Sequence, residues 1–141
     1  MKTYYKVVSY NPIIKQYVSI INVFSNHYEL AHKFGVEYKI GQWTTPIVDG
    51  TSLMCFRDLY SAEIFKTQLD RTELKIFKCY AKGVHRNYKL FYPLYVHQNI
   101  ANKVDFFLEQ KKKKKRITNT VFDQVPYGTV FCKKIMLLEE V

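Results

Sequence analysis

The sequence predicts a single α+β domain, in which an antiparallel or mixed sheet of five or six strands carries two helices on one side. Its 141 residues are the length of one domain, and 48% of them are hydrophobic. Extended segments outnumber amphipathic helical ones along the chain. They follow one another without regular βαβ alternation, which favours an α+β class over a parallel α/β class. We therefore expect one domain over residues 1–141.

The first forty residues predict mainly strands. Tyr4–Tyr10 and Tyr17–Val23 are rich in β-branched and aromatic residues, and Asn11-Pro12 between them indicates a turn. This pattern predicts a β-hairpin. A short helical turn over Glu29–Lys33 and a strand at Val36–Ile40 are expected to follow.

The middle of the chain predicts a loop, a strand, a helix and another strand. Thr44–Gly50 has the composition of a loop, and Ser52–Phe56 is a short apolar strand. Asp58 is a suitable N-cap for the helix that follows. On that helix four apolar residues fall within about 120° of one another and define a buried face: Leu59, Ala62, Phe65 and Leu69. Glu73–Lys82 is the next expected strand.

The last third combines an insert with a final strand. Asn87–Val96 is expected to be extended, as an edge strand or irregular loop because it contains Pro93. A second amphipathic helix is predicted from Asn99, where Ile100, Val104, Phe107 and Leu108 share a face. We treat residues 83–124 as an insert in the domain. After a turn at Val125–Gly128, the sequence predicts one strand over Thr129–Leu138.

A run of six cations dominates the charge of the chain. The net charge is +10, from 22 Lys and Arg against 12 Asp and Glu. Without the run, 16 cations against 12 anions leave +4, so the basicity is concentrated in one segment. The run consists of Lys111, Lys112, Lys113, Lys114, Lys115 and Arg116.

Several roles fit this run. It is a candidate for binding phosphates or another polyanion, because each neutralised phosphate releases counterions. An acidic membrane surface, an acidic protein surface or a nuclear localisation signal are alternatives. The structural alternative is a solvated helix end, where lysines oppose the negative end of the helix dipole.

Four further residues are candidates for contacting a ligand. Arg57 lies between an apolar strand and a helix start, where it can meet a phosphate or pair with a nearby carboxylate. Trp43 lies in a loop-like context, from which it can cover a pocket or anchor the loop. Tyr88 and Tyr92 alternate with basic residues and can stack on unpaired bases, or pack as cross-strand pairs.

The sequence predicts no catalytic residues, no metal ligands and no cofactor. The common phosphate-loop, dinucleotide, hydrolase and zinc-protease motifs are missing, and the chain has only five glycines. Cys55 and Cys79 have apolar neighbours, while Cys132 adjoins Lys133. Buried structural thiols are the favoured interpretation of all three.

Four short segments resemble a group of small uncharacterised proteins of phages and large DNA viruses. They are Tyr5–Val8, Val36–Trp43, Leu53–Phe65 and Pro126–Glu139, with the strand motifs YKVV and P-x-G-T-V-x-C…LLE. The resemblance transfers no catalytic residue. It implies a viral accessory or virion-associated protein.

These observations lead to three hypotheses about function. The first is a non-enzymatic binding protein that recognises nucleic acid, a nucleotide-type ligand or an acidic protein surface, alone or as a homo-oligomer. The second is a minor capsid or other virion component, and the third is a small nucleotide-processing enzyme. The chain shows no signal peptide and no apolar run of about 18–20 residues, so we expect a location in the host cytoplasm, nucleus or virion.

Overall fold

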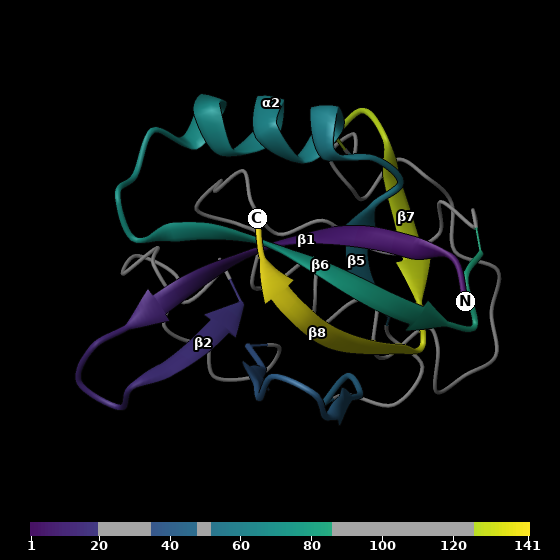
Figure 1. The fold of residues 1–141 in the computed structure, drawn as a ribbon, viewed down its shortest axis with the longest axis horizontal. Coiled ribbons are helices and arrows are strands. Elements are labelled where there is room, and N and C mark those ends of the chain that lie inside the picture. The colour runs from purple at the N-terminus through teal and green to yellow at the C-terminus, as the bar shows by residue number, and fades with distance from the viewer. Residues whose placement is uncertain (20–34, 48–51, 86–125) are drawn as a thin grey trace, which may run out of the picture.

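The computed structural model describes residues 1–19, 35–47, 52–85 and 126–141, and within these ranges the chain forms eight strands and one helix (Figure 1). The elements are β1 (Thr3–Asn11), β2 (Gln16–Ser19), β3 (Glu37–Tyr38), β4 (Trp43–Thr44), β5 (Leu53–Phe56), α2 (Leu59–Leu69), β6 (Leu74–Lys82), β7 (Thr129–Cys132) and β8 (Lys134–Glu140). They form one sheet with the main order β3-β2-β1-β6-β8-β4, and β5 and β7 pair beside this path. Every strand pair is antiparallel.

The pairing closes into a small barrel. Strand β1 pairs along its length with β6, and Tyr5 of β1 also pairs with Phe56 of β5. Strand β5 pairs with β7, and Phe131 of β7 forms a bridge with His85, just beyond the end of β6. The sheet therefore closes from β1 through β6, the His85 bridge, β7 and β5 back to β1. Strands β2, β3, β8 and β4 continue the sheet, and β3 and β8 also contribute side chains to the interior.

Helix α2 begins as its sequence predicts. The Asp58 carboxylate accepts a hydrogen bond from the Ser61 backbone N–H at 2.7 Å, which confirms the N-cap. The helix ends at Asp70, which adopts a left-handed conformation and donates its N–H to the Lys66 carbonyl. The predicted buried face is confirmed, since Ala62 and Phe65 are buried against the sheet.

Two apolar clusters stabilise the fold, one on each face of the sheet. Because β1 is covered on both faces, its centre is nearly continuously buried: Tyr4 and Val8 point into the barrel, and Val7 points toward α2. The interior cluster contains Tyr4, Val8, Val36, Tyr38, Leu53, Cys55, Phe77, Cys79, Val130, Cys132, Ile135 and Leu137. The outer cluster, under α2, contains Val7, Phe56, Ala62, Phe65, Leu74 and Ile76.

The expectation of an α+β domain with five or six strands and two helices is wrong. The described residues form eight strands and a single helix, so the fold is mainly β. The strand expected at Val36–Ile40 is present as β3 over Glu37–Tyr38, where it pairs with β2. Strand β4 is an addition, and it pairs with β8 over two residues. The predicted helical turn at 29–33 and the predicted elements at 87–96 and from residue 99 lie outside the described residues.

Two local predictions are also wrong. Trp43 and Thr44 do not lie in a loop, because they pair as β4 with Met136 and Ile135 of β8. The final segment is two strands and not one, since β7 pairs with β5 whereas β8 pairs with β6. The change of partner occurs at Lys133, whose backbone N–H donates to the Lys82 carbonyl at 2.8 Å.

Candidate binding surface

The outer face of the sheet is divided into two halves. In the covered half, Tyr5, Val7, Met54, Phe56, Leu74 and Ile76 pack under α2. The open half carries side chains from three adjacent strands that do not belong to this packing: Trp43, Tyr80, Lys82, Lys134 and Met136. In Figure 1, β6 and β8 cross the front of the molecule and α2 lies along its upper side.

The register brings the five side chains of the open half together. Met136 of β8 is the direct partner of Trp43 on one side and of Tyr80 on the other. Opposite residues in an antiparallel pair point to the same face, so these three side chains form a row across the sheet. Lys82 and Lys134 are also direct partners and lie two residues along their strands, on the same face.

The cations of the open half lack carboxylate partners. The Lys82 Nζ lies 4.6 Å from the centre of the Trp43 ring, a cation–π contact. Lys133 adjoins Lys134 in the sequence, and its side chain lies against the position that a Cβ on Gly83 would take. In the described part of the chain, none of Lys82, Lys133 and Lys134 forms an ion pair, whereas Lys78 lies 3.6 Å from Glu139.

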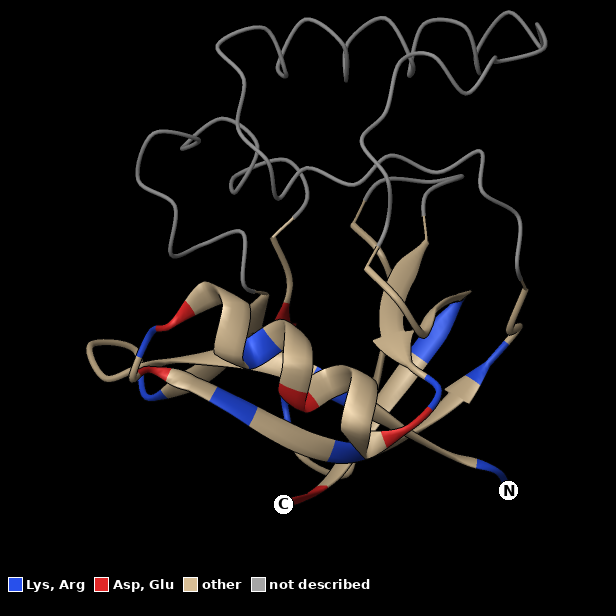
Figure 2. Cartoon of the chain, turned by 90° about the horizontal axis from the view of Figure 1, so that it is seen from above, with Lys and Arg blue, Asp and Glu red and all other residues tan. Residues whose placement is uncertain are grey.

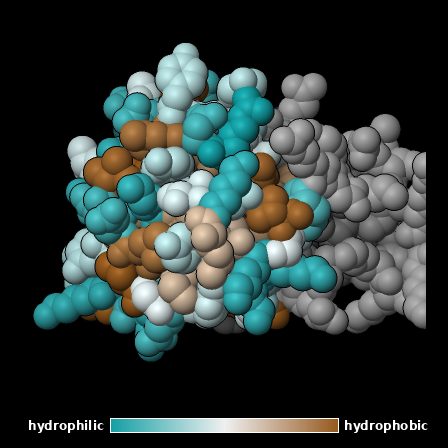
Figure 3. Space-filling model, turned by 45° about the vertical axis from the view of Figure 1, so that its right-hand side comes forward, coloured by the Kyte–Doolittle hydropathy of each residue, from teal (hydrophilic) through white to brown (hydrophobic). Residues whose placement is uncertain are grey.

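Charge is mixed over the rest of the described surface. Lys and Arg occur on the strands and on α2 with Asp and Glu between them (Figure 2). On the face in Figure 3, apolar side chains reach the surface in small groups separated by hydrophilic ones. The open half therefore differs from its surroundings in combining unpaired cations with large half-buried aromatic side chains.

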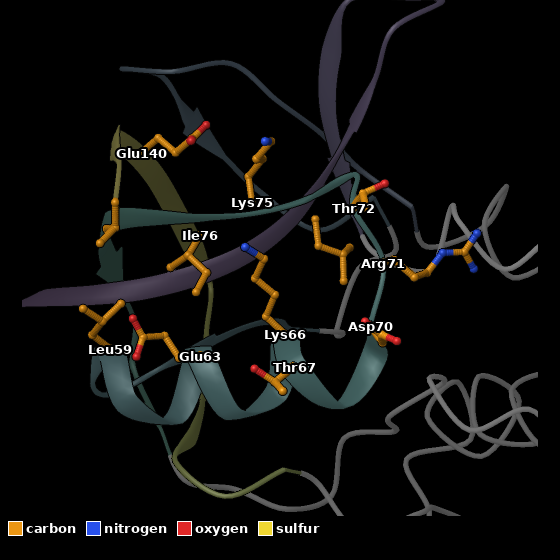
Figure 4. Close-up of a pocket in the computed structure, with 12 residues that line it drawn as sticks. Leu59, Glu63, Lys66, Thr67, Asp70, Arg71, Thr72, Lys75, Ile76 and Glu140 are labelled. Carbon is orange, nitrogen blue, oxygen red and sulfur yellow. The ribbon is translucent and has the colours of Figure 1, made fainter.

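A groove of about 570 Å³ lies at the other end of the sheet, between α2 and the ends of β6 and β8. Lys66 points from the helix toward β6 in this groove, and Glu63, Asp70 and Glu140 also line it (Figure 4). Arg71 pairs with Glu73 at 2.6 Å and points away from the groove. Carboxylates thus surround the cations here, which makes this groove a poor site for a polyanion.

Arg57 lies at the N-terminus of α2 and has two close contacts. Its Nε lies 3.3 Å from Oδ2 of Asp58, and its guanidinium lies 4.6 Å from the centre of the Tyr127 ring. The backbone N–H of Ser61, with further help from Arg57, lowers the pKa of Asp58, so this carboxylate stays charged at the helix N-terminus. The structure therefore shows the carboxylate pairing that was the alternative to phosphate contact.

The three cysteines converge in the barrel interior. All three are buried, and the Cys132 thiol donates a hydrogen bond to the Leu53 carbonyl oxygen, with sulfur and oxygen 3.7 Å apart. Hydrogen bonding to Cys132 and Cys79, together with burial, raises the pKa of the Cys55 thiol well above its ordinary value. A protonated buried thiol is a poor nucleophile, which argues against Cys55 as a nucleophile. The burial of all three residues supports their interpretation as structural thiols.

One buried cation was missed by the sequence analysis. Lys6 points into the barrel, where its Nζ donates to the Met54 carbonyl at 2.7 Å and lies 5.4 Å from the centre of the Tyr38 ring. Burial raises the pKa of Tyr38, and the Tyr38 hydroxyl has no hydrogen-bond partner among the described residues. These groups are enclosed by the interior cluster, so they are not available to a large ligand.

The structure brings together only part of the predicted site. Trp43 joins the open half, whereas Arg57 lies at the helix, and Lys111 to Lys115, Arg116, Tyr88 and Tyr92 lie outside the described residues. The other four residues of the open half were not predicted as site residues. In both Tyr80-Ala81-Lys82 and Lys134-Ile135-Met136, the first and third residues are at least partly exposed. Only the cross-strand register joins them.

The described residues give little further indication of function. Within the described ranges, no cluster of three or more His, Cys, Asp or Glu side chains is placed to bind a metal ion, and no helix there is long and apolar enough to cross a membrane. His85 is engaged, with its Nε2 3.1 Å from the Ser52 Oγ. Comparison of the chain with protein-family models, with curated proteins and with solved structures gave no match.

Proposed function

We propose that this protein is a non-enzymatic binding module whose open half binds the phosphates of a nucleic acid. The observation that carries the proposal is the register of β6 and β8, which sets Lys82 directly opposite Lys134. Like charges directly opposite one another destabilise an antiparallel pair. A local cost without a structural benefit is typical of a functional position.

The surroundings of this pair support a polyanion as the ligand. Lys133 adds a third cation beside Gly83, and none of the three lysines has a carboxylate partner in the described part of the chain. A phosphate backbone neutralises several neighbouring cations at once and releases counterions, which a single small anion does not. The positive charge is thus arranged for an extended ligand.

The run from Lys111 to Arg116 adds to this proposal without carrying it. Its six cations would increase affinity for the same class of ligand by the same counterion release. A run of lysines does not by itself specify how the charges are arranged in space, whereas the strand register fixes the neighbours of Lys82 and Lys134. The two groups of cations can therefore be tested separately.

The test is a salt titration of binding to nucleic acid with three variants. The triple variant Lys82→Gln, Lys133→Gln, Lys134→Gln is expected to reduce the slope of log affinity against log salt by about 2 to 3. The matched control Lys15→Gln, Lys66→Gln, Lys75→Gln removes the same charge elsewhere and is expected to change the slope little. Neutralising Lys111 to Lys115 should weaken binding but leave a salt-dependent remainder.

The possible outcomes distinguish phosphate binding by the open half from binding by another segment and from the absence of polyanion binding. Equal slopes for the triple variant and the wild type would show that the open half does not bind phosphates. Complete loss of binding in the Lys111 to Lys115 variant would assign the activity to that run instead. Binding that does not respond to salt at all would reject a polyanion ligand.

A further inference from the structure

The aromatic side chains of the open half differ from the aromatic residues elsewhere in the sheet. Tyr17 packs edge-on against Phe77 with ring centres 4.7 Å apart, and Phe56 packs against Phe65 at 5.2 Å. Trp43 and Tyr80 have no ring partner in the described part of the chain. Aromatic pairing among the described residues therefore does not account for these two rings.

The two rings are held at a defined separation. Trp43 and Tyr80 flank Met136 across three neighbouring strands, so their backbones lie about 10 Å apart. Both residues are half-buried and therefore partly exposed to solvent. Such a row offers two flat apolar surfaces next to the unpaired lysines.

Resting on the proposed function, we propose that the nucleic acid is single-stranded, with Trp43 and Tyr80 stacking on its unpaired bases. Stacking on aromatic side chains requires bases that are not already stacked inside a duplex. Lys82 contacts the Trp43 ring at 4.6 Å, so a base that stacks there has a cation beside it for the adjoining phosphate. The open half would then contact both the bases and the phosphates of the ligand.

This arrangement also predicts the kind of selectivity. Every base has a flat aromatic face, so stacking tolerates different sequences. No described side chain of the open half offers a carboxylate or an amide for reading base edges. We therefore expect discrimination between single strand and duplex, with little discrimination among base sequences.

The chain supplies its own optical probe, because Trp43 is its only tryptophan. A thymidine oligonucleotide of about 12 nucleotides is expected to quench the Trp43 fluorescence. A duplex of the same length and heparin, which has charge but no bases, are expected to bind without comparable quenching. The single strand should bind at least about 10-fold more tightly than the duplex.

Three substitutions test the stacking residues by the anisotropy of a labelled oligonucleotide. Trp43→Leu and Tyr80→Leu should each weaken single-strand binding by roughly 5- to 100-fold, because each removes one stacking surface. Tyr80→Phe should retain the affinity. The matched control is Tyr60→Leu, which removes an exposed ring from α2 and should leave binding unchanged.

The failures of the two proposals are distinguishable. If duplex, heparin and single strand bind equally, with unchanged Trp43 fluorescence, the inference of single-strand stacking is overturned while phosphate binding stands. If no polyanion binds, both proposals fall. Should Trp43→Leu fail to fold, the quenching of the wild type and the affinity of Tyr80→Leu decide the question.

Discussion

The covered and open halves of the outer sheet face share strand β6 but carry different kinds of side chain. On the covered half, β1 and β6 contribute Val7, Leu74 and Ile76 to a close-packed cluster under α2. On the open half, β6 and β8 contribute the opposed Lys82 and Lys134, and β6 and β4 contribute the rings of Tyr80 and Trp43. Strand β6 thus contributes to apolar packing at one end and carries side chains of the proposed binding surface at the other.

The two halves contribute differently to the stability of the folded domain. Large side chains of the covered half contribute to stability because they leave water, roughly in proportion to the area that is buried. The open half gains little of this and carries a repulsive pair. Substitutions should accordingly affect folding on the covered half and binding on the open half.

The largest expected effect comes from a glycine on the covered side. Gly128 has φ +79°, and a Cβ there would overlap the Ser61 side chain of α2. Gly128→Ala should lower the free energy of unfolding by about 2–4 kcal/mol, since a left-handed alanine and a displaced Ser61 both cost energy. Urea denaturation measures the change.

Gly41, beside β4 near the open half, provides the matched control for this substitution. Its φ is +78°, but a Cβ there would meet no atom within 4 Å. Gly41→Ala should therefore cost only the conformational part, about 1–2 kcal/mol. Equal losses for the two variants would show that the contact between Gly128 and Ser61 contributes nothing.

A smaller effect is expected at the N-cap of α2, and it should depend on pH. Asp58→Ala should lower the free energy of unfolding by about 1 kcal/mol at neutral pH. The folded-state pKa of Asp58 is lowered, chiefly by the hydrogen bond from the Ser61 N–H. Its contribution is therefore fully present above the unfolded pKa of about 3.9 and is lost as the pH falls through the lower folded value.

Urea denaturation of wild type and Asp58→Ala at several pH values checks this dependence. The difference between the two proteins should shrink as the solution is acidified below pH of about 4. A difference that stays constant down to the acid limit would show that the charge of Asp58 is irrelevant to the cap.

The smallest effect on stability is expected in the open half. Lys134→Gln removes the repulsion across the pair with Lys82, so the domain should be unchanged or stabilised by up to about 0.5 kcal/mol at low salt. The same variant should bind nucleic acid more weakly. A clear loss of stability in thermal unfolding would mean that Lys134 has a structural role, and would break the division between the halves.

Local features of the fold could be predicted from the sequence. The hairpin around Asn11-Pro12, the strand at 53–56, the Asp58 cap and the buried face of α2 are all confirmed, because neighbouring residues specify each of them. The strand expected at Val36–Ile40 is also found, shortened to β3 over Glu37–Tyr38. Strand β4 could not be predicted in this way, because its hydrogen bonds come from the distant strand β8.

The candidate site shows the same limit. Trp43 was a candidate because of its expected loop context, and that context was wrong. Tyr80, Lys82 and Lys134 alternate on strands like many solvent-facing residues, and only the pairing of β4, β8 and β6 makes them neighbours.

By itself, the sequence determined that this chain has a basic excess, a capped helix and buried thiols. These properties depend on composition and on short-range periodicity. The tertiary structure alone decided that the sheet closes on itself and that Lys82 faces Lys134 beside Trp43. The physical reason is that register and closure are set by burying side chains distant in sequence, which fixes the face on which every strand residue lies.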